Sequence, residues 1–165
     1  MKTLMLMRHA KSSWKEPLPE DRDRPILKKG IKRTKRTALF IKEKGLIPEL
    51  ILSSPAVRAW QTAELLIEEL VTNLKIKQVD AMYPGSSAAL LKTIWQVNNK
   101  YSRLMIIGHN PGLSDLACYL LGNQEASWIP TSGLVVISFV NGRWQETKPG
   151  EGVMLHYIQP KALPD

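Results

Sequence analysis

Short apolar runs and longer segments with a helical repeat alternate along the chain. The short runs, such as 4–7 and 104–107, have no polar face, which is typical of strands buried on both sides of a sheet. The longer segments repeat apolar residues every three or four positions, as amphipathic helices do. The pattern predicts strands at 2–8, 49–54, 75–80 and 103–108, and helices at 28–44, 55–70, 86–99 and 111–122.

Capping residues support two of the helix starts. Pro55 suits the first helical position, with Ser53 or Ser54 as N-cap before it, and Ser86 or Ser87 can cap the third helix. Near the C-terminus, "GLVVISFV", "GRWQET" and "VMLHYI" predict three further strands.

Strands that alternate with helices predict an α/β fold. We expect a mostly parallel central sheet with helices on both faces, which makes a three-layer αβα sandwich. The sequence shows no internal repeat, low-complexity tract or interdomain linker. We therefore expect one domain over 1–165.

Charged and polar side chains follow the predicted strands. In parallel sheets, ligands bind beyond the carboxyl ends of the strands, so these residues are the candidates for a functional site. The first four strands are followed by Arg8-His9, by Ser54 with Arg58 in the next helix, by Asp80 and by His109.

The types of these residues favour an anion site over a metal site. His9, His109 and Asp80 would make a possible facial metal set, but Arg8 and Arg58 would repel a divalent cation. Arginines hold phosphate through charge-assisted hydrogen bonds, and helix N-termini add positive dipole ends. The set therefore predicts a phosphate pocket that needs no metal and no other cofactor.

An imidazole in such a pocket predicts phosphoryl transfer to nitrogen. One ring nitrogen would attack phosphorus while a protein acceptor holds the other N–H. A second, protonated histidine would stabilise the charge on the equatorial oxygens together with the arginines. The sequence has no glycine-rich Walker motif, so a nucleotide-driven mechanism is not expected.

The net charge of +8 favours anionic partners. Much of the excess lies in the predicted helix at 28–44, which could form a stripe for nucleic acid. The stripe lacks interleaved aromatic residues, so we interpret it as a solvated helix face and do not expect nucleic-acid binding. Its basic residues are Lys28, Lys29, Lys32, Arg33, Lys35, Arg36, Lys42 and Lys44.

The remaining composition predicts a soluble cytoplasmic protein. Cys118 is the one cysteine, which precludes an internal disulfide, and its apolar neighbours predict a core position. His156 lies within a late predicted strand, so we expect a structural role for it. Arg8 interrupts the first apolar stretch well short of a signal peptide, and no run approaches the ~20 residues of a membrane span. We expect a monomer, because no long exposed apolar stripe is evident.

Several segments resemble the histidine phosphatase (phosphoglycerate mutase-like) superfamily. "LMLMRHAKSSW" resembles its RHG signature, with Ala10 in place of the usual glycine, and "ILSSPAVRAWQTAELL" resembles its S-x-x-x-R-A-x-Q-T motif. "MIIGHNPGLSDLACYL" resembles its G-H-x-P motif. "DRDRPILKKG" and "DAMYPGSSAALLKTI" are similar to the short SixA-like branch. Together these segments extend from the N-terminus to about residue 121, in the order of the family.

The resemblance implies a phosphoglycerate mutase-like fold and roles for particular residues. His9 would be the nucleophile that forms a phosphohistidine intermediate, and Arg8, Arg58 and His109 would complete the phosphate pocket. Ala10 beside the nucleophile would require a backbone angle that alanine tolerates.

Four further residues fall at positions where the family places functional groups. Arg24 would be an additional phosphate contact, with pairing to a neighbouring aspartate as the structural alternative. Ser12 or Ser13 falls where the superfamily often places a hydroxyl near phosphate. Asp80 falls where members with alcohol leaving groups place a general acid.

The resemblance implies a phosphohistidine phosphatase acting on a signalling protein such as a phosphotransfer domain. The short connections, such as "AMYPG", predict an open site that suits a phosphorylated protein side chain. The alternative is a phosphatase for a small phosphoester, such as a sugar phosphate or a nucleotide, with Asp80 as general acid. A phosphate-binding module without turnover is disfavoured, because a binder does not need the adjacent imidazole.

Overall fold

A six-stranded mixed sheet forms the centre of the molecule. The computed structural model describes residues 1–13 and 20–163. The sheet has the order β3-β2-β4-β1-β5-β6, in which the first four of these strands are parallel and β5 is antiparallel to both of its neighbours. The strands are β1 Lys2–Arg8, β2 Leu50–Ser53, β3 Ile76–Gln78, β4 Arg103–Gly108, β5 Leu134–Phe139 and β6 Val153–Ile158.

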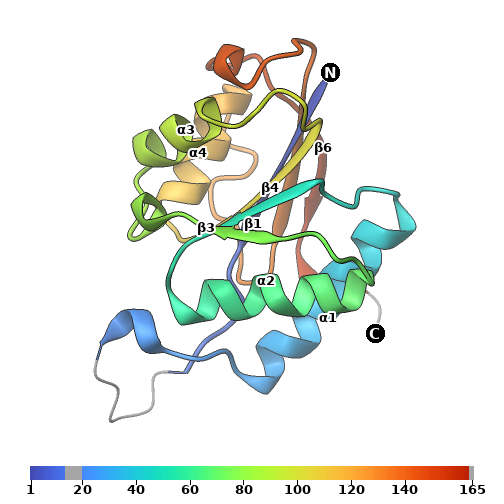
Figure 1. Ribbon diagram of the computed structural model, residues 1–165, viewed down its shortest axis with the longest axis vertical. Helices are drawn as coiled ribbons and strands as arrows, with labels where there is room; N and C mark the ends of the chain where they lie inside the picture. The colour runs from blue at the N-terminus through green and yellow to red at the C-terminus, as the bar shows by residue number, and fades with distance from the viewer. Residues whose placement is uncertain (14–19, 164–165) are drawn as a thin grey trace.

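Helices cover both faces of this sheet (Figure 1). The longer ones are α1 Lys28–Glu43, α2 Val57–Leu70, α3 Ser87–Trp95 and α4 Gly112–Leu121. Helices α1 and α2 pack on one face, and α3 and α4 pack on the other. The predicted α/β sandwich with a mostly parallel sheet is therefore confirmed.

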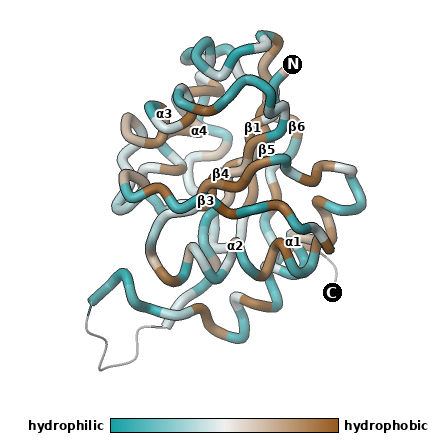
Figure 2. The backbone as a smooth tube through the Cα atoms, viewed as in Figure 1, coloured by the Kyte–Doolittle hydropathy of each residue, from teal (hydrophilic) through white to brown (hydrophobic). Residues whose placement is uncertain are grey.

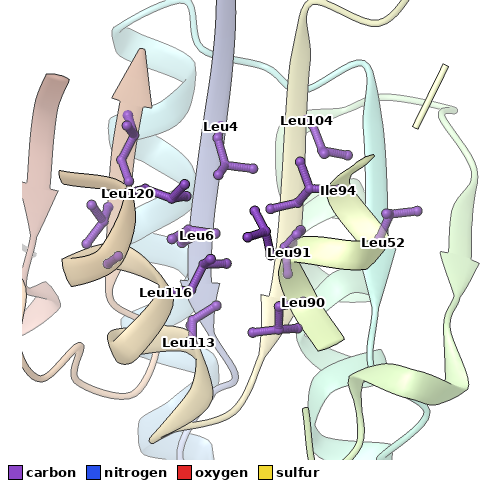
Figure 3. Packing of buried hydrophobic residues seen from close by; sticks show 14 of the residues in the cluster. Leu4, Leu6, Leu52, Leu90, Leu91, Ile94, Leu104, Leu113, Leu116 and Leu120 are labelled. Atoms are coloured by element: carbon purple, nitrogen blue, oxygen red, sulfur yellow. The ribbon is translucent and has the colours of Figure 1, made fainter. Parts of the chain in front are cut away.

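Strand β1 separates the two cores. Its apolar residues are fully buried and alternate between the faces, so Leu4 and Leu6 contact the α3–α4 side while Met5 and Met7 contact the α1–α2 side. Figure 3 shows Leu4 and Leu6 facing the leucines of α3 and α4. The apolar segments gather along the central strands in Figure 2. Burial on both faces holds β1 rigid, and so holds the residues at its end.

The strand register brings three strand ends to one level. Arg8 pairs with Gly108, and Ser53 pairs with Ile107. Beyond the strands, the His9 N–H donates to the Gly108 carbonyl at 3.1 Å, and the Ser54 N–H donates to the Ile107 carbonyl at 3.1 Å. The residues that follow β1, β2 and β4 therefore lie side by side.

Some of the predicted element boundaries were wrong. Helix α2 begins at Val57, because the Ser54 hydroxyl accepts from the Ala56 N–H in the turn before it. The Ser86 cap of α3 is confirmed by its bond from the Ala89 N–H, but α3 ends at Trp95.

The segment "GRWQET" forms a short 3-10 helix at Trp144–Glu146 instead of a strand. Its Trp144 is buried, with the indole N–H donating to the Tyr101 carbonyl at 2.9 Å. The position of this segment is therefore set by the burial of Trp144 and not by pairing with the sheet.

Cys118 is only partly buried, so its predicted core position was wrong. It lies on the outer side of α4, next to the exposed Tyr119. His156 on β6 contacts the Phe40 ring edge-on, with ring centroids 5.2 Å apart. Among the helices in the described part of the chain, none is long and apolar enough to cross a membrane.

Candidate active site

A strongly cationic pocket lies where the ends of β1, β2 and β4 meet. Its volume is about 480 Å³. It is lined by Arg8, His9, Lys11, Ser12, Asp21, Arg24, Arg33, Arg58, His109, Asn110 and Thr131. Arginine and lysine side chains outnumber the single carboxylate in this lining, so the pocket suits an anion. The structure thus brings Arg8, His9, Arg58 and His109 together, as the sequence predicted.

His9 has a fixed ring orientation and one ring nitrogen that carries a lone pair. The ring is 6% exposed, and its Nδ1 lies 2.8 Å from the Ala10 carbonyl oxygen. A carbonyl only accepts, so Nδ1 carries the proton and Nε2 keeps its lone pair. The Arg58 Nε lies 3.4 Å from that Nε2. This is the tautomer that an attacking imidazole requires.

Both histidines of the pocket favour the neutral form. Burial is the main cause that lowers the pKa of His9 to about 3, with smaller contributions from His109, Arg58 and Arg8. Burial and then the charge of Arg58 lower the pKa of His109 to about 4. These surroundings keep the nucleophile unprotonated at neutral pH, and they also keep His109 neutral, contrary to the expectation of a protonated second histidine. A bound phosphate dianion would oppose the charges of the arginines and raise both pKa values.

His109 leaves one nitrogen for a ligand. Its Nε2 lies 2.7 Å from the Ser54 hydroxyl oxygen, which fixes the ring. Its Nδ1 is buried and has no hydrogen-bond partner among the described residues. The rings of His9 and His109 have centroids 5.0 Å apart, so one phosphoryl group could contact both.

Arg58 is held beside His9 by Asp21. Its Nη1 donates to the Asp21 carbonyl at 2.9 Å, and its Nη2 lies 3.1 Å from Asp21 Oδ2. Tyr83 donates to the same carboxylate at 2.7 Å, and Arg24 pairs with its other oxygen at 3.0 Å. Burial would raise the pKa of Asp21, but the Tyr83 hydrogen bond and the two arginines outweigh it and leave the pKa lowered.

Asp21 and Tyr83 were not among the predicted site residues. Arg24 combines the two interpretations of the sequence, because it pairs with Asp21 and also lines the pocket. The segment "DRDRP" was the available signal for Asp21. Tyr83 gave none, since it reaches Asp21 from a loop that is distant in the sequence.

Arg8 contributes a buried guanidinium. Its Nη1 donates to the Ile129 carbonyl at 3.2 Å, and its guanidinium carbon lies 5.4 Å from the centroid of the Trp128 ring. Its Nε is buried without a hydrogen-bond partner among the described residues. Burial and the nearby charge of Arg58 lower the pKa of Arg8. A bound anion would favour the charged guanidinium and oppose both effects.

Helix α1 supports the backbone at the end of β1. The Ser132 N–H donates to the carbonyls of Arg8 and His9, each at 3.1 Å. The Ser132 hydroxyl bonds Thr34 at 2.8 Å, and its carbonyl accepts from Thr37 at 2.7 Å. Buried hydroxyls of α1 thus position the nucleophile through one serine.

Ala10 fits without a left-handed backbone. Among the described non-glycine residues, positive φ occurs at Val71 and Ser132, and not at Ala10. The Ala10 N–H donates to Thr62 Oγ1 at 2.9 Å. The space for the Ala10 methyl group exists because Gly30 of α1 faces it, where a Cβ would lie 3.1 Å from that methyl.

The remaining predicted residues lie in different places. Ser12 is 5% exposed and lines the pocket, whereas Ser13 does not line it and donates its N–H to the Pro25 carbonyl. Asp80 is exposed, accepts from Gln78 at 3.2 Å and lines a separate cavity between β3 and α3. The structure therefore does not bring Asp80 to His9. No group of three or more histidine, cysteine, aspartate or glutamate side chains in the described ranges could hold a metal ion.

The low histidine pKa values predict that stability falls in acid. Below about pH 6.5 the unfolded chain binds protons that the folded chain does not, so the free energy of unfolding should drop by up to about 1.4 kcal/mol per pH unit for each histidine. The drop continues toward the folded pKa values of about 3 and about 4. Urea unfolding from pH 7 to 4.5 should show a flatter dependence for the double variant His9→Asn/His109→Gln. Identical slopes for both proteins would contradict this assignment.

Comparison with known proteins places this geometry in a family. Residues 4–82 match the model of the histidine phosphatase superfamily (branch 1). An uncharacterized protein of Picosynechococcus sp. is 36% identical over 118 residues, which cover 69% of this chain and 70% of the relative. An uncharacterized protein of Mycobacterium tuberculosis is 25% identical over 164 residues, which cover 94% and 100% of the two chains.

A solved structure extends the similarity over nearly the whole chain. The SixA protein of Agrobacterium tumefaciens, provisionally described as a phosphohistidine phosphatase, superposes with a TM-score of 0.83 at 26% identity. The match covers 96% of this chain and 98% of that one. The chain belongs to the histidine phosphatase superfamily. The similarity to SixA confirms the short SixA-like branch of this family, and family membership supports phosphatase activity.

Proposed function

We propose that this histidine phosphatase hydrolyses phosphohistidine in a protein, through a covalent intermediate on His9. The support from geometry is the state of the pocket carboxylate. Asp21 is bound by Arg58, Arg24 and Tyr83, and its pKa is lowered. Among the described lining residues there is no other carboxylate. The pocket therefore holds phosphate well but offers no ready acid for an alcohol leaving group.

The proposed reaction has two displacement steps. First, His9 Nε2 attacks phosphorus, a new P–N bond forms, and the P–N bond to the substrate imidazole breaks. Water then attacks phosphorus, the P–N bond to His9 breaks, and inorganic phosphate leaves. Arg8, Arg58 and His109 surround the transferred group and would stabilise its oxygens in both transition states. The charges of Arg8 and Arg58 would perform the electrostatic role that metal ions have in other phosphotransferases, while His109 would contribute a hydrogen bond.

The leaving group decides between the two candidate substrates. An alkoxide from a sugar or serine phosphate must receive a proton as it departs, which requires a positioned acid. An imidazole leaves far more readily, and its other nitrogen already carries a proton or takes one from water. A pocket whose carboxylate is ionised favours the substrate with the better leaving group. The single cysteine favours the cytoplasm as the proposed compartment.

The phosphoester alternative depends on Asp80. It would require that Asp80 reach the leaving oxygen, yet this residue lines a different cavity and contacts Gln78. The place of Asp80 thus disfavours the phosphoester, in agreement with the ionised state of Asp21.

A substrate panel tests the proposal. With EDTA present, kcat/KM for a histidine-phosphorylated peptide should exceed that for phosphoserine, a sugar phosphate and a nucleotide by roughly a hundredfold or more. Asp80→Asn should leave all of these values unchanged. Faster turnover of a sugar phosphate, with a loss in Asp80→Asn, would instead establish the phosphoester activity.

A further inference from the structure

The phosphate pocket continues into two more hollows on the surface. The middle hollow has a volume of about 260 Å³ and shares Arg8, Arg33 and Thr131 with the pocket. The outer hollow has a volume of about 360 Å³ and shares Arg33 and Lys161 with the middle one. Because each hollow shares side chains with the next, the three adjoin one another in a row that begins at His9. We call the middle and outer hollows together the furrow extension.

The middle hollow has apolar walls. Trp128, Pro130 and Pro160 line it together with the shared cations and Gln159. Trp128 is 57% exposed, although its ring lies over the Arg8 guanidinium. An exposed tryptophan between two prolines, directly beside a phosphate pocket, suits an apolar side chain of the group that carries the phosphate.

The outer hollow is lined by cations. Its described lining consists of Lys29, Lys32, Arg33, Arg36 and Lys161. The first four lie on one face of α1, at the spacing of successive helical turns. Lys161 comes from the short 3-10 helix at Pro160–Ala162, whose Pro160 carbonyl accepts from Arg36 Nη1 at 3.4 Å. Lys29, Arg33 and Lys161 bring like charges to one hollow, and such a group of charges favours an anionic ligand.

The neighbouring surface limits what the furrow extension can bind. On the α2 side of α1, Lys35 pairs with Glu69 at 3.7 Å, so the cationic face ends there. Helix α2 also carries Glu64 and Glu68. A nucleic-acid duplex needs a long basic track for its phosphates. A short basic hollow, with the Lys35–Glu69 pair on the α2 side of the same helix, suits a short acidic segment better.

We propose that the furrow extension is a docking surface for an acidic segment of the phosphorylated protein. An apolar side chain near the phosphohistidine occupies the middle hollow, and carboxylates beyond it contact Lys29, Lys161 and their neighbours. The inference rests on the proposed function, since it names the class of phosphoprotein that the same site takes. It assigns a role to the basic residues of α1 other than Arg33, which already lines the phosphate pocket.

The test uses peptides that differ only in charge. Each carries one chemically phosphorylated histidine and an adjacent leucine, followed or preceded by three glutamates or three glutamines. At low ionic strength, kcat/KM for an acidic peptide should exceed that for its neutral counterpart by about tenfold, and the ratio should shrink as salt rises. Lys29→Glu/Lys161→Glu should bring the ratio close to one.

A matched variant controls for net charge. Lys42→Glu/Lys75→Glu changes two exposed lysines that line none of these hollows, and it should keep the tenfold ratio. Equal rates on acidic and neutral peptides, or equal losses in both double variants, would overturn the docking surface. Binding of a DNA duplex that is lost only in Lys29→Glu/Lys161→Glu would overturn it too, by assigning the surface to nucleic acid.

Free phosphohistidine separates the two proposals. If wild-type protein hydrolyses free phosphohistidine and all peptides equally, the phosphatase activity stands and the docking surface does not. If it hydrolyses none of them but acts on a phosphoester, the proposed function fails and the docking proposal fails with it.

Discussion

His9→Asn is expected to lower the turnover of phosphohistidine peptides by a factor of about a thousand or more. Removal of the attacking group eliminates the covalent route, and losses of this size are typical for enzymatic nucleophiles. Asparagine is the informative replacement, because its amide N–H can still donate to the Ala10 carbonyl that holds His9 Nδ1. The fold of the strand end is thereby kept while the free ring nitrogen is lost.

The phosphorylated intermediate gives an independent measurement. Wild-type protein quenched during turnover of a ³²P-labelled substrate should carry label that is lost in acid and stable in base, as expected for a phosphoramidate. His9→Asn should carry none. His156→Asn is the matched control. His156 lies on β6, packs against Phe40 of α1 and does not line the pocket. If label persists in His9→Asn, or if the variant's rate is within tenfold of wild type, a residue other than His9 is the nucleophile.

Gly112→Ala is expected to be the most destabilising of the small substitutions. A Cβ at this first residue of α4 would lie 1.8 Å from the Gly85 carbonyl oxygen and 2.9 Å from its carbon. Both contacts are with backbone, so either α4 or the turn before α3 must move. Overpacking of this kind costs typically 1–3 kcal/mol and sometimes more, so we expect about 3 kcal/mol or more. At this chain length the loss corresponds to a fall in Tm of roughly 10 °C.

Thermal unfolding of a matched pair tests this prediction. Gly142→Ala is the control, because a Cβ there meets nothing within 4 Å and the residue is exposed. It should keep the wild-type Tm within about 1 °C. Gly112→Ala should also lose activity, since only Pro111 separates the start of α4 from His109 and Asn110 of the pocket. Equal Tm values for the two variants would contradict the prediction, because they would show that the turn before α3 can move without loss of stability.

The sequence predicted the centre of the fold better than its edges. Strands β1 and β4 are apolar on both faces, so their ends and the side chains there could be located from the pattern alone. Strand β3 has only three residues, Ile76–Gln78, and lies at the sheet edge. With one partner strand, its end is less constrained, and Asp80 begins a 3-10 turn instead of pointing toward the pocket that holds His9.

Some residues of the candidate site could likewise be predicted from the sequence, and others could not. Arg8, His9, Arg58 and His109 follow strands or begin a helix, so local pattern places them. Asp21 and Tyr83 lie in connecting segments that are distant in the sequence, and they meet where the Asp21 carboxylate accepts from both Tyr83 and Arg58. Distances between loops depend on tertiary packing, which hydrophobic periodicity does not encode.

Helix α1 has two faces with separate tasks. Its buried Thr34 and Thr37 connect through Ser132 to the backbone of Arg8 and His9, while its exposed cations line the outer hollow. Changes on the outer face therefore leave the inner hydroxyls in place. On the proposed docking surface, partner choice could therefore change, by design or over evolutionary time, while the residues around His9 stay the same. Variants with acidic residues in place of Lys29, Lys32 and Lys161 would then share one reaction but act on different protein substrates.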